Sequence, residues 1–206
     1  MTTEEQDRLR TVLERRFALS TSLPAAFFER EAPRIAEACW AMARRFHQGG
    51  RLLAFGNGAW ATDAQHVSVE FVHPVIVGKR ALPALALTND SATLTGLLAS
   101  GPGGRPEMPF REQLRILARP QDMALGFSPD GRCANVQAAL AQARQMGLLT
   151  LAMLGGDGGL ITAEAVDYRF VVPADDPFIV QEIHETLYHV LWELVHVFFE
   201  HEGLLQ

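Results

Sequence analysis

The chain has 206 residues, a length that suits one domain with an additional helical segment rather than two full modules. Hydrophobic residues make up 48% and charged residues 20%, so the composition excludes an intrinsically disordered chain and a coiled coil. The formal net charge of -6 argues against nucleic acid as a dominant partner, because binding to a phosphate backbone requires a concentrated basic surface.

The first fifty residues predict two helices. Apolar residues at helical spacing mark the first one, and they are Leu9, Val12, Leu13 and Phe17. Ser20 to Ser22 and Pro24 predict a break, after which a second helix is expected from about Ala25 to His47. We assign residues 1–48 to an N-terminal helical extension and expect it to serve packing or oligomerisation.

Residues 49–206 alternate short apolar runs with helical patterns. Strands are predicted at Leu52–Phe55, Leu82–Leu87, Met123–Phe127, Leu148–Leu154 and Tyr168–Val172. Helices are expected at about Thr62–Val72, Ser91–Leu98, Phe110–Leu117, Cys133–Met146, Leu160–Ala165 and Phe178–Glu200. The runs lack polar alternation, which is typical of strands covered on both faces. The pattern predicts an α/β fold: a single doubly wound, Rossmann-like domain with about five parallel strands and helices on both faces.

The cysteines and the apolar segments bear on the compartment. Cys39 and Cys133 form no CxxC pair, which argues against a disulfide scaffold or a cysteine-rich zinc site and fits a reducing cytosol. The polar N-terminal stretch lacks the apolar run of a secretory signal. The apolar segment from Phe178 to Phe199 carries polar groups that would be too costly in lipid. We therefore expect a cytoplasmic chain without a membrane contact.

Three of the predicted strands end in polar or glycine-rich segments. Gly56-Asn57-Gly58 follows the first strand, Asn89-Asp90-Ser91 the second, and Ser128-Pro129-Asp130-Gly131 the third. Ligands of open α/β sheets bind beyond the carboxyl ends of the strands. The Gly101-Pro102-Gly103-Gly104 stretch predicts a loop, which we expect to be the most mobile segment.

Two helices carry polar residues that could do chemistry. His66 and Glu70 are four residues apart, so both side chains leave the same face of a helix and suit a divalent metal or an acid–base pair. A solvated surface pair is an equally simple interpretation of this spacing. On the closing helix, Gln181, Glu185 and His189 recur every four residues among apolar neighbours, where buried polar groups require partners.

Together these segments resemble a known family. GNG, DAQH with a glutamate four residues later, LALTND, GFS and QEIHETLYH resemble the sugar isomerase (SIS) domain, and within it the phosphoheptose isomerase branch. The resemblance implies that His66, Glu70, Gln181 and His189 bind a metal, typically zinc. It also implies that Glu70 and His189 act as base and acid in converting sedoheptulose 7-phosphate into an aldoheptose 7-phosphate. The resemblance further implies a homotetramer with active sites at subunit contacts.

The spacing of Gln181 and His189 constrains this site. Eight residues of regular helix span about 12 Å at about 1.5 Å per residue. The two side chains therefore cannot both bind one ion from the same continuous helix. Either the helix begins after Gln181, or the site is shared between subunits.

The phosphate-binding loops depart from the family pattern. Trp60 stands where serine is usual, and Ser128-Pro129-Asp130-Gly131-Arg132-Cys133 stands where the family reads STSGNS. Two unit charges about 4 Å apart interact by about 4 kcal/mol at an effective dielectric constant of about 20. Asp130 would therefore oppose a phosphate unless Arg132 neutralises it or binds the phosphate directly. We expect phosphate binding to be lost.

The substrate-binding candidates follow the predicted strands or lie on the closing helix, and they are Asn57, Gly58, Asp90, Ser91, Ser128, Asp130, Arg132, Cys133 and Gln181. Asp90 and Ser91 could equally cap the helix that follows them. His73 could replace an arginine that the family has after the catalytic glutamate, or it could be an ordinary loop histidine.

Three functions stay open. The first is a metal-dependent aldose–ketose isomerase of the phosphoheptose type with an altered substrate. The second is a non-catalytic sugar-binding or regulatory protein, similar to the SIS-domain tetramers that associate with a replication initiator; those tend to lack the glutamate kept here as Glu70. The third is an enzyme for an unphosphorylated or nucleotide-linked sugar, suggested by the aromatic ring of Trp60 and the carboxylate of Asp130.

Overall fold

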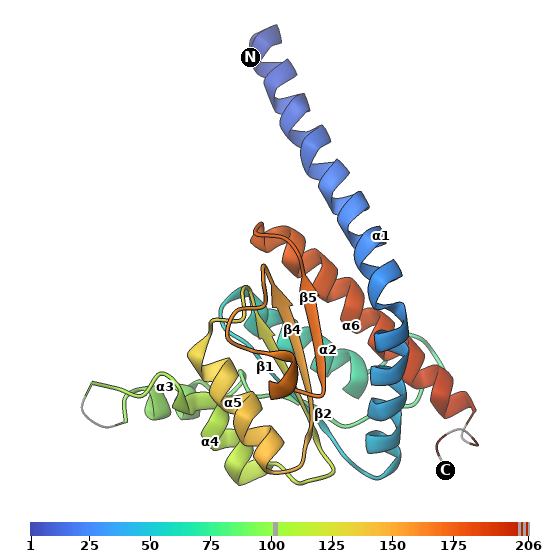
Figure 1. Ribbon diagram of the computed structural model, residues 1–206, viewed down its shortest axis with the longest axis vertical. Coiled ribbons are helices and arrows are strands. Elements are labelled where there is room, and N and C mark those ends of the chain that lie inside the picture. The colour runs from blue at the N-terminus through green and yellow to red at the C-terminus, as the bar shows by residue number, and fades with distance from the viewer. Residues whose placement is uncertain (101–102, 202, 204, 206) are drawn as a thin grey trace.

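The computed structural model describes residues 1–100, 103–201, 203 and 205. Its centre is one five-stranded parallel sheet in the order β2-β1-β3-β4-β5 (Figure 1). The strands are β1 (Leu52–Phe55), β2 (Ala84–Ala86), β3 (Met123–Ser128), β4 (Leu149–Gly155) and β5 (Tyr168–Val172). The helices are α1 (Thr3–His47), α2 (Ala59–Val72), α3 (Ser91–Leu98), α4 (Met108–Leu117), α5 (Ala134–Gln145) and α6 (Pro177–Glu200). The predicted α/β architecture is confirmed.

Helices cover both faces of the sheet, which explains why the strands are apolar throughout. On β1, Leu52 and Ala54 pack into the core beneath α1, α2 and α6, whereas Leu53 and Phe55 pack beneath α4 and α5. All four side chains are fully buried. Burial on both faces removes the polar alternation that a half-exposed strand would show.

The strand order reverses at β1, because β2 lies on one side of it and β3 on the other. At such a switch point, the chain leaves the carboxyl ends of neighbouring strands in opposite directions and opens a crevice for a ligand. Asn57, just after β1, and Asn135, at the start of α5, meet there. Each amide donates a hydrogen bond of 2.8 Å to the other.

The N-terminal segment is one continuous helix, so the prediction of two helices was wrong. Pro24 removes a backbone hydrogen bond, as any helical proline does, yet α1 continues through it. The hydroxyl of Ser22 donates to the carbonyl of Ala18 at 2.9 Å and supports the preceding turn. Contacts on the N-terminal side of the proline add to this: Arg16 binds Asp176 at 2.6 Å, which holds the first half of α1 against the start of α6.

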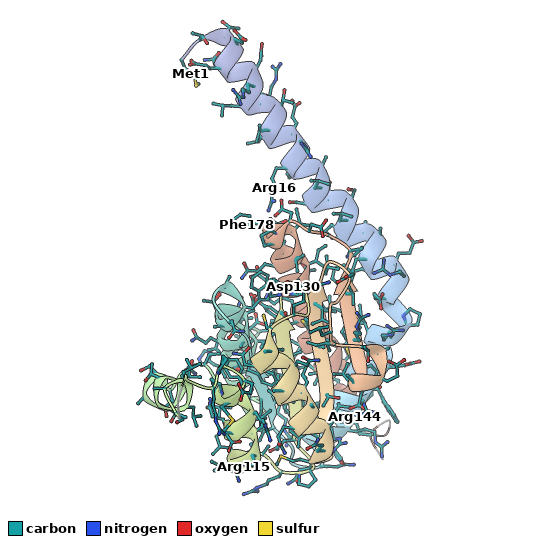
Figure 2. All side chains as sticks on the ribbon, turned by 60° about the vertical axis from the view of Figure 1, so that its left-hand side comes forward. Met1, Arg16, Arg115, Asp130, Arg144 and Phe178 are labelled. Atoms are coloured by element: carbon teal, nitrogen blue, oxygen red, sulfur yellow. The ribbon has the colours of Figure 1, made fainter. Side chains whose placement is uncertain are left out.

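The first half of α1 extends away from the sheet (Figure 1). Its apolar stripe faces solvent in the single chain, since all four members are more than half exposed: Leu9, Val12, Leu13 and Phe17. Where α1 reaches α6, Arg16 lies beside Phe178, with the guanidinium carbon 5.5 Å from the ring centroid (Figure 2). The second half of α1 instead buries its apolar face in the core, including Phe27 and Met42.

One further prediction differs from the structure, and another falls partly outside the described residues. The expected helix Leu160–Ala165 is only a single 3-10 turn, Ala163–Ala165. Gly158 and Gly159 precede it with positive φ angles of 78° and 55°, a backbone that starts no α-helix, and the chain is held there by Arg169, which donates to the carbonyl of Ile161 at 2.6 Å. Of the predicted glycine-rich loop, residues 101–102 lie outside the described residues. Among the described residues, no helix is long and apolar enough to cross a membrane.

Candidate functional site

Helices α2 and α6 lie together and bring three of the predicted site residues into one cluster. Glu70 Oε1 is 3.3 Å from His66 Nε2 and 3.1 Å from His189 Nε2. The helices are tied at this level by Trp192, whose indole N–H donates to the backbone carbonyl of Glu70 at 2.9 Å. The carboxylate and imidazole predicted to act as base and acid therefore do lie side by side.

The charge and burial of this cluster suit a divalent cation. One ligand atom from each of His66, Glu70 and His189 lies within 4.8 Å of the other two. Glu70 is largely buried, and among the described atoms its Oε2 has no hydrogen-bond partner. An unpaired buried acceptor is costly, and a bound cation would offset that cost. Two imidazoles and a carboxylate are donors that zinc accepts.

A cavity of about 320 Å³ opens beside the cluster. Glu70 and His189 form one wall of it, and Val75, Ile76, Trp192 and Glu193 form the rest. The side chains of His66 and His189 are partly exposed, so small molecules can reach the imidazoles from solvent. The volume is of the order that small-molecule sites occupy.

Gln181 lies elsewhere in the single chain. Helix α6 already begins at Pro177, which excludes a helix that starts after Gln181. The side-chain amide of Gln181 donates to Asp63 Oδ2 at 3.0 Å and to the carbonyl of Ala59 at 3.3 Å. In the single chain the Gln181 amide is thus bound to Asp63.

Asp63 is a buried acid beside the site that sequence reasoning missed. Burial raises its pKa to about 6, against the hydrogen bond from Gln181, which lowers it. The signal was present in the sequence, because Asp63 precedes His66 by three residues and therefore shares its helix face.

Tyr188 is the second residue whose role the sequence did not reveal. Its hydroxyl oxygen is 2.8 Å from His66 Nδ1, and its side chain is fully buried. Burial, together with the nearby carboxylates of Asp63, Glu185 and Glu70, raises the pKa of Tyr188 well above the usual value. The phenol is therefore neutral at any physiological pH.

Trp60 and His184 form a buried pair beneath the loop after β1. The Trp60 indole N–H donates to His184 Nδ1 at 3.2 Å, and His184 Nε2 lies 3.2 Å from the carbonyl of Leu154, to which it donates. Burial lowers the pKa of His184 to about 4, so the ring is neutral and its tautomer is fixed. Trp60 is 9% exposed, so the expectation that its ring is offered to a sugar was wrong.

The loop after β3 packs tightly on the loop after β4. A side chain on Gly131, whose φ is +72°, would collide with the carbonyl of Gly158. Ser128 is buried, and its hydroxyl accepts a hydrogen bond of 3.0 Å from the Gly131 N–H, which closes the turn. Cys133 follows as the N-cap of α5 and makes no side-chain hydrogen bond to the helix.

Arg132 pairs with a residue that the sequence did not suggest. Its guanidinium donates to both carboxylate oxygens of Asp157, at 2.9 and 2.8 Å. This pairing lowers the pKa of Asp157 to about 2. Asp130, at the carboxyl end of β3 (Figure 2), instead accepts the backbone N–H of Arg132 at 2.9 Å. The two loops together thus present two carboxylates and one guanidinium to solvent.

The segment after β2 has a structural role in the single chain. Asp90 caps α3 by accepting the Thr93 N–H at 3.0 Å and the Thr93 hydroxyl at 2.6 Å, which lowers the pKa of Asp90. Ser91 is the first residue of that helix and is exposed. Asn57 is bound to Asn135, and Gly58 precedes α2 with a φ of 57°. Within the described ranges, no hydrogen bond joins Asp90 or Ser91 to the cluster around Glu70.

Known proteins share this sequence and this arrangement. The SIS domain family model matches residues 17–155. The phosphoheptose isomerase of Solidesulfovibrio magneticus is 39% identical over 85% of this chain and 84% of its own length, and that of Aquifex aeolicus is 38% identical over 87% and 92%.

Solved structures agree with the sequence relatives. Phosphoheptose isomerase GmhA from Neisseria gonorrhoeae superposes with a TM-score of 0.82 at 29% identity, covering 91% of this chain and 98% of that one. A phosphoheptose isomerase from Francisella tularensis superposes with a TM-score of 0.76 at 26% identity, covering 96% and 100%. The chain therefore belongs to the SIS-domain family, within its phosphoheptose isomerase branch.

Proposed function

We propose that this chain is a sugar-phosphate isomerase that interconverts a ketose and an aldose, with sedoheptulose 7-phosphate or a related sugar as its substrate. The observation that carries the proposal is the contact of Glu70 Oε1 with His189 Nε2 at 3.1 Å beside a cavity. The phosphoheptose isomerases, which share 39% and 38% identity with the chain over most of its length, support the substrate class.

The arrangement suits proton transfer between neighbouring carbons of a sugar. The Glu70 carboxylate takes the proton alpha to the carbonyl, which yields an enediolate, and returns it to the adjacent carbon. From the ring nitrogen that would not bind a cation, His189 donates a proton to the oxygen on which negative charge develops, and it takes back the proton that the neighbouring hydroxyl loses when the new carbonyl forms. Because Glu70 Oε1 contacts both imidazoles, each histidine also orients the carboxylate.

A divalent cation, zinc or another first-row ion, completes the site in this proposal. His66, Glu70 and His189 would hold it. When bound, it supplies a Lewis acid that polarises the substrate carbonyl and stabilises negative charge on its oxygen. The ligand types suit zinc but also other first-row ions.

The proposed assembly is a homotetramer with shared sites. Gln181 lies in the same continuous helix as His189, so it could join the cation only from another subunit. The exposed apolar stripe on α1, from Leu9 to Phe17, gives subunits a surface to bury. Two free cysteines, Cys39 and Cys133, support a reducing cytoplasmic location.

The loops that would bind the phosphate end of the substrate carry an unfavourable charge pattern. Asp130 and Asp157 outnumber Arg132 in the loops where a phosphate would bind, and we propose that they weaken its affinity. The Arg132–Asp157 pair is exposed to solvent and screened, so Arg132 can leave it when a stronger anion competes. This charge pattern favours, as a second candidate, an isomerase for the corresponding unphosphorylated sugar; Trp60 no longer supports that candidate.

Turnover measured on a matched pair of substrates tests the proposal. Purified protein is incubated with zinc and either sedoheptulose 7-phosphate or sedoheptulose, and aldose formation is followed by mass spectrometry and NMR. Turnover of the phosphate alone supports the first function, and turnover of the free sugar alone supports the second. No turnover of either by a folded, metal-loaded oligomer would contradict both and favour a non-catalytic role.

A further inference from the structure

The hydroxyl of the buried Tyr188 side chain is directed at the Nδ1 nitrogen of His66. The distance from Tyr188 Oη to His66 Nδ1 is 2.8 Å. The phenol ring cannot easily turn away, because it packs edge-on against Phe127 at 6.1 Å and against His189 at 5.0 Å between ring centroids. It also meets the His66 ring edge-on at 5.4 Å. Tyr188 thus contacts both imidazoles of the cluster.

The two nitrogens of His66 have different neighbours. Nε2 faces Glu70 Oε1 at 3.3 Å, and Nδ1 faces the Tyr188 hydroxyl. A neutral imidazole carries one proton, on either nitrogen. Without a cation, the proton belongs on Nε2, where it meets the Glu70 carboxylate, and Nδ1 accepts from the Tyr188 O–H.

Binding a cation through Nε2 reverses these roles. Nε2 must then offer its lone pair, so the proton must sit on Nδ1. The Tyr188 oxygen can accept that N–H, because a hydroxyl both donates and accepts and needs only to rotate its hydrogen. His66 therefore keeps one hydrogen-bond partner in both states, and no heavy atom has to move.

The other neighbour of Nδ1 cannot do this. Glu185 Oε1 is 3.6 Å from His66 Nδ1, beyond the range of a normal hydrogen bond, and that side chain is partly exposed. An ionised carboxylate also only accepts, so it would serve just one of the two tautomers. The Tyr188 hydroxyl lies within hydrogen-bond distance at 2.8 Å and can both donate and accept, so it can serve both tautomers.

We infer that Tyr188 is a positioning residue for His66: its hydroxyl orients the imidazole and, by changing from donor to acceptor, lets His66 bind a divalent cation through Nε2. This inference rests on the metal-dependent function proposed above, and it adds to that function a residue outside the ligand set.

The variant Tyr188→Phe removes only the hydroxyl, and the chain offers a matched control. Tyr168 is the one other tyrosine, and its hydroxyl donates to the carbonyl of Glu37 at 3.3 Å, away from the cluster. Zinc affinity of the metal-stripped proteins is measured by competition with a chromophoric chelator, together with the visible spectrum of the cobalt-loaded forms. We expect Tyr188→Phe to lose about 10-fold to 100-fold in affinity and to change the cobalt spectrum, and Tyr168→Phe to match the wild type.

The outcomes separate the two claims. If the folded wild-type oligomer binds no zinc or cobalt, the metal-dependent function fails. If the wild type binds zinc and Tyr188→Phe binds it equally well, the inference about Tyr188 is overturned while the metal site stands. If Tyr188→Phe does not fold, nitrogen-15 NMR of the wild-type histidines still tests the inference. We expect the proton of His66 to move from Nε2 to Nδ1 when zinc binds. A proton that stays on Nε2 contradicts the inference.

Discussion

Glu70 on α2 and His189 on α6 lie side by side, with 3.1 Å between Oε1 and Nε2. The carboxylate is largely buried, whereas the imidazole is partly exposed to the neighbouring cavity. A base held in a low-dielectric setting next to a solvent-accessible acid is an arrangement that enzymes use to pass a proton between carbon and oxygen.

Replacing Glu70 by Gln should lower the turnover rate at least about 100-fold and leave the fold intact. The amide keeps the shape of the side chain but cannot take a proton. Turnover by NMR and unfolding by circular dichroism measure the two effects. Glu193→Gln is the matched control, because Glu193 is exposed and lines the same cavity. Full activity in Glu70→Gln would disprove the role of Glu70 as the base.

His184 should make stability depend on pH. Its folded-state pKa of about 4 lies below the usual 6.5. Below pH 6.5 the unfolded chain therefore binds a proton that the folded chain does not, so the contribution of His184 is complete above pH 6.5 and is lost as the pH falls towards 4. At about 1.4 kcal/mol per pKa unit, the loss is roughly 3 kcal/mol.

Urea unfolding of the wild type and of His184→Gln between pH 4 and 8 measures this effect. Glutamine keeps a donor and an acceptor for Leu154 and Trp60 but does not titrate. The difference between the two free energies of unfolding cancels other groups, including Asp63, whose raised pKa acts in the opposite direction. A difference that is constant across this range would show that His184 is not held neutral.

Asp157→Asn should strengthen the binding of a phosphorylated substrate. The change releases the guanidinium of Arg132 and removes one negative charge from the loop. We expect KM for the sugar phosphate to fall a few-fold at low salt, with little change in kcat and a smaller effect at high salt. The free sugar serves as the control substrate. An equal change for both substrates would place the effect outside phosphate recognition.

Charge on the exposed stripe of α1 should disrupt the oligomer. Leu13→Glu and Phe17→Glu each place a carboxylate where we expect a second subunit to pack. Light scattering after size-exclusion chromatography should show smaller species, and turnover should fall with them if sites are shared. Ile116→Glu, at an exposed position on α4, is the control. A wild-type chain that is already a monomer, with full activity, would rule out the shared site.

The local pattern of the chain determined most of the fold. β1, β5 and α3 have the bounds that hydrophobic periodicity predicted, and the other strands differ only at their ends. Periodicity works here because strands covered on both faces must be apolar throughout. The pairing of His66 with Glu70 is equally local, since four residues of helix return a side chain to the same face. Pro24 is the instructive exception, because local chemistry predicted a break and α1 nevertheless continues through it, with Arg16 in contact with the start of α6 on the other side of the proline.

Only the tertiary structure decided which partners the polar groups find. The packing of α2 against α6 brings His189 to Glu70, directs Tyr188 to His66, and joins Gln181 to Asp63. The packing of the loops after β3 and β4 likewise places the Arg132 guanidinium next to the Asp157 carboxylate. The buried Trp60 indole donates a hydrogen bond to His184. None of these distances follows from spacing along the chain. Contacts between polar side chains on different elements depend on how the helices and loops pack on the sheet. Burial of apolar surface determines that packing, and the polar contacts result from it.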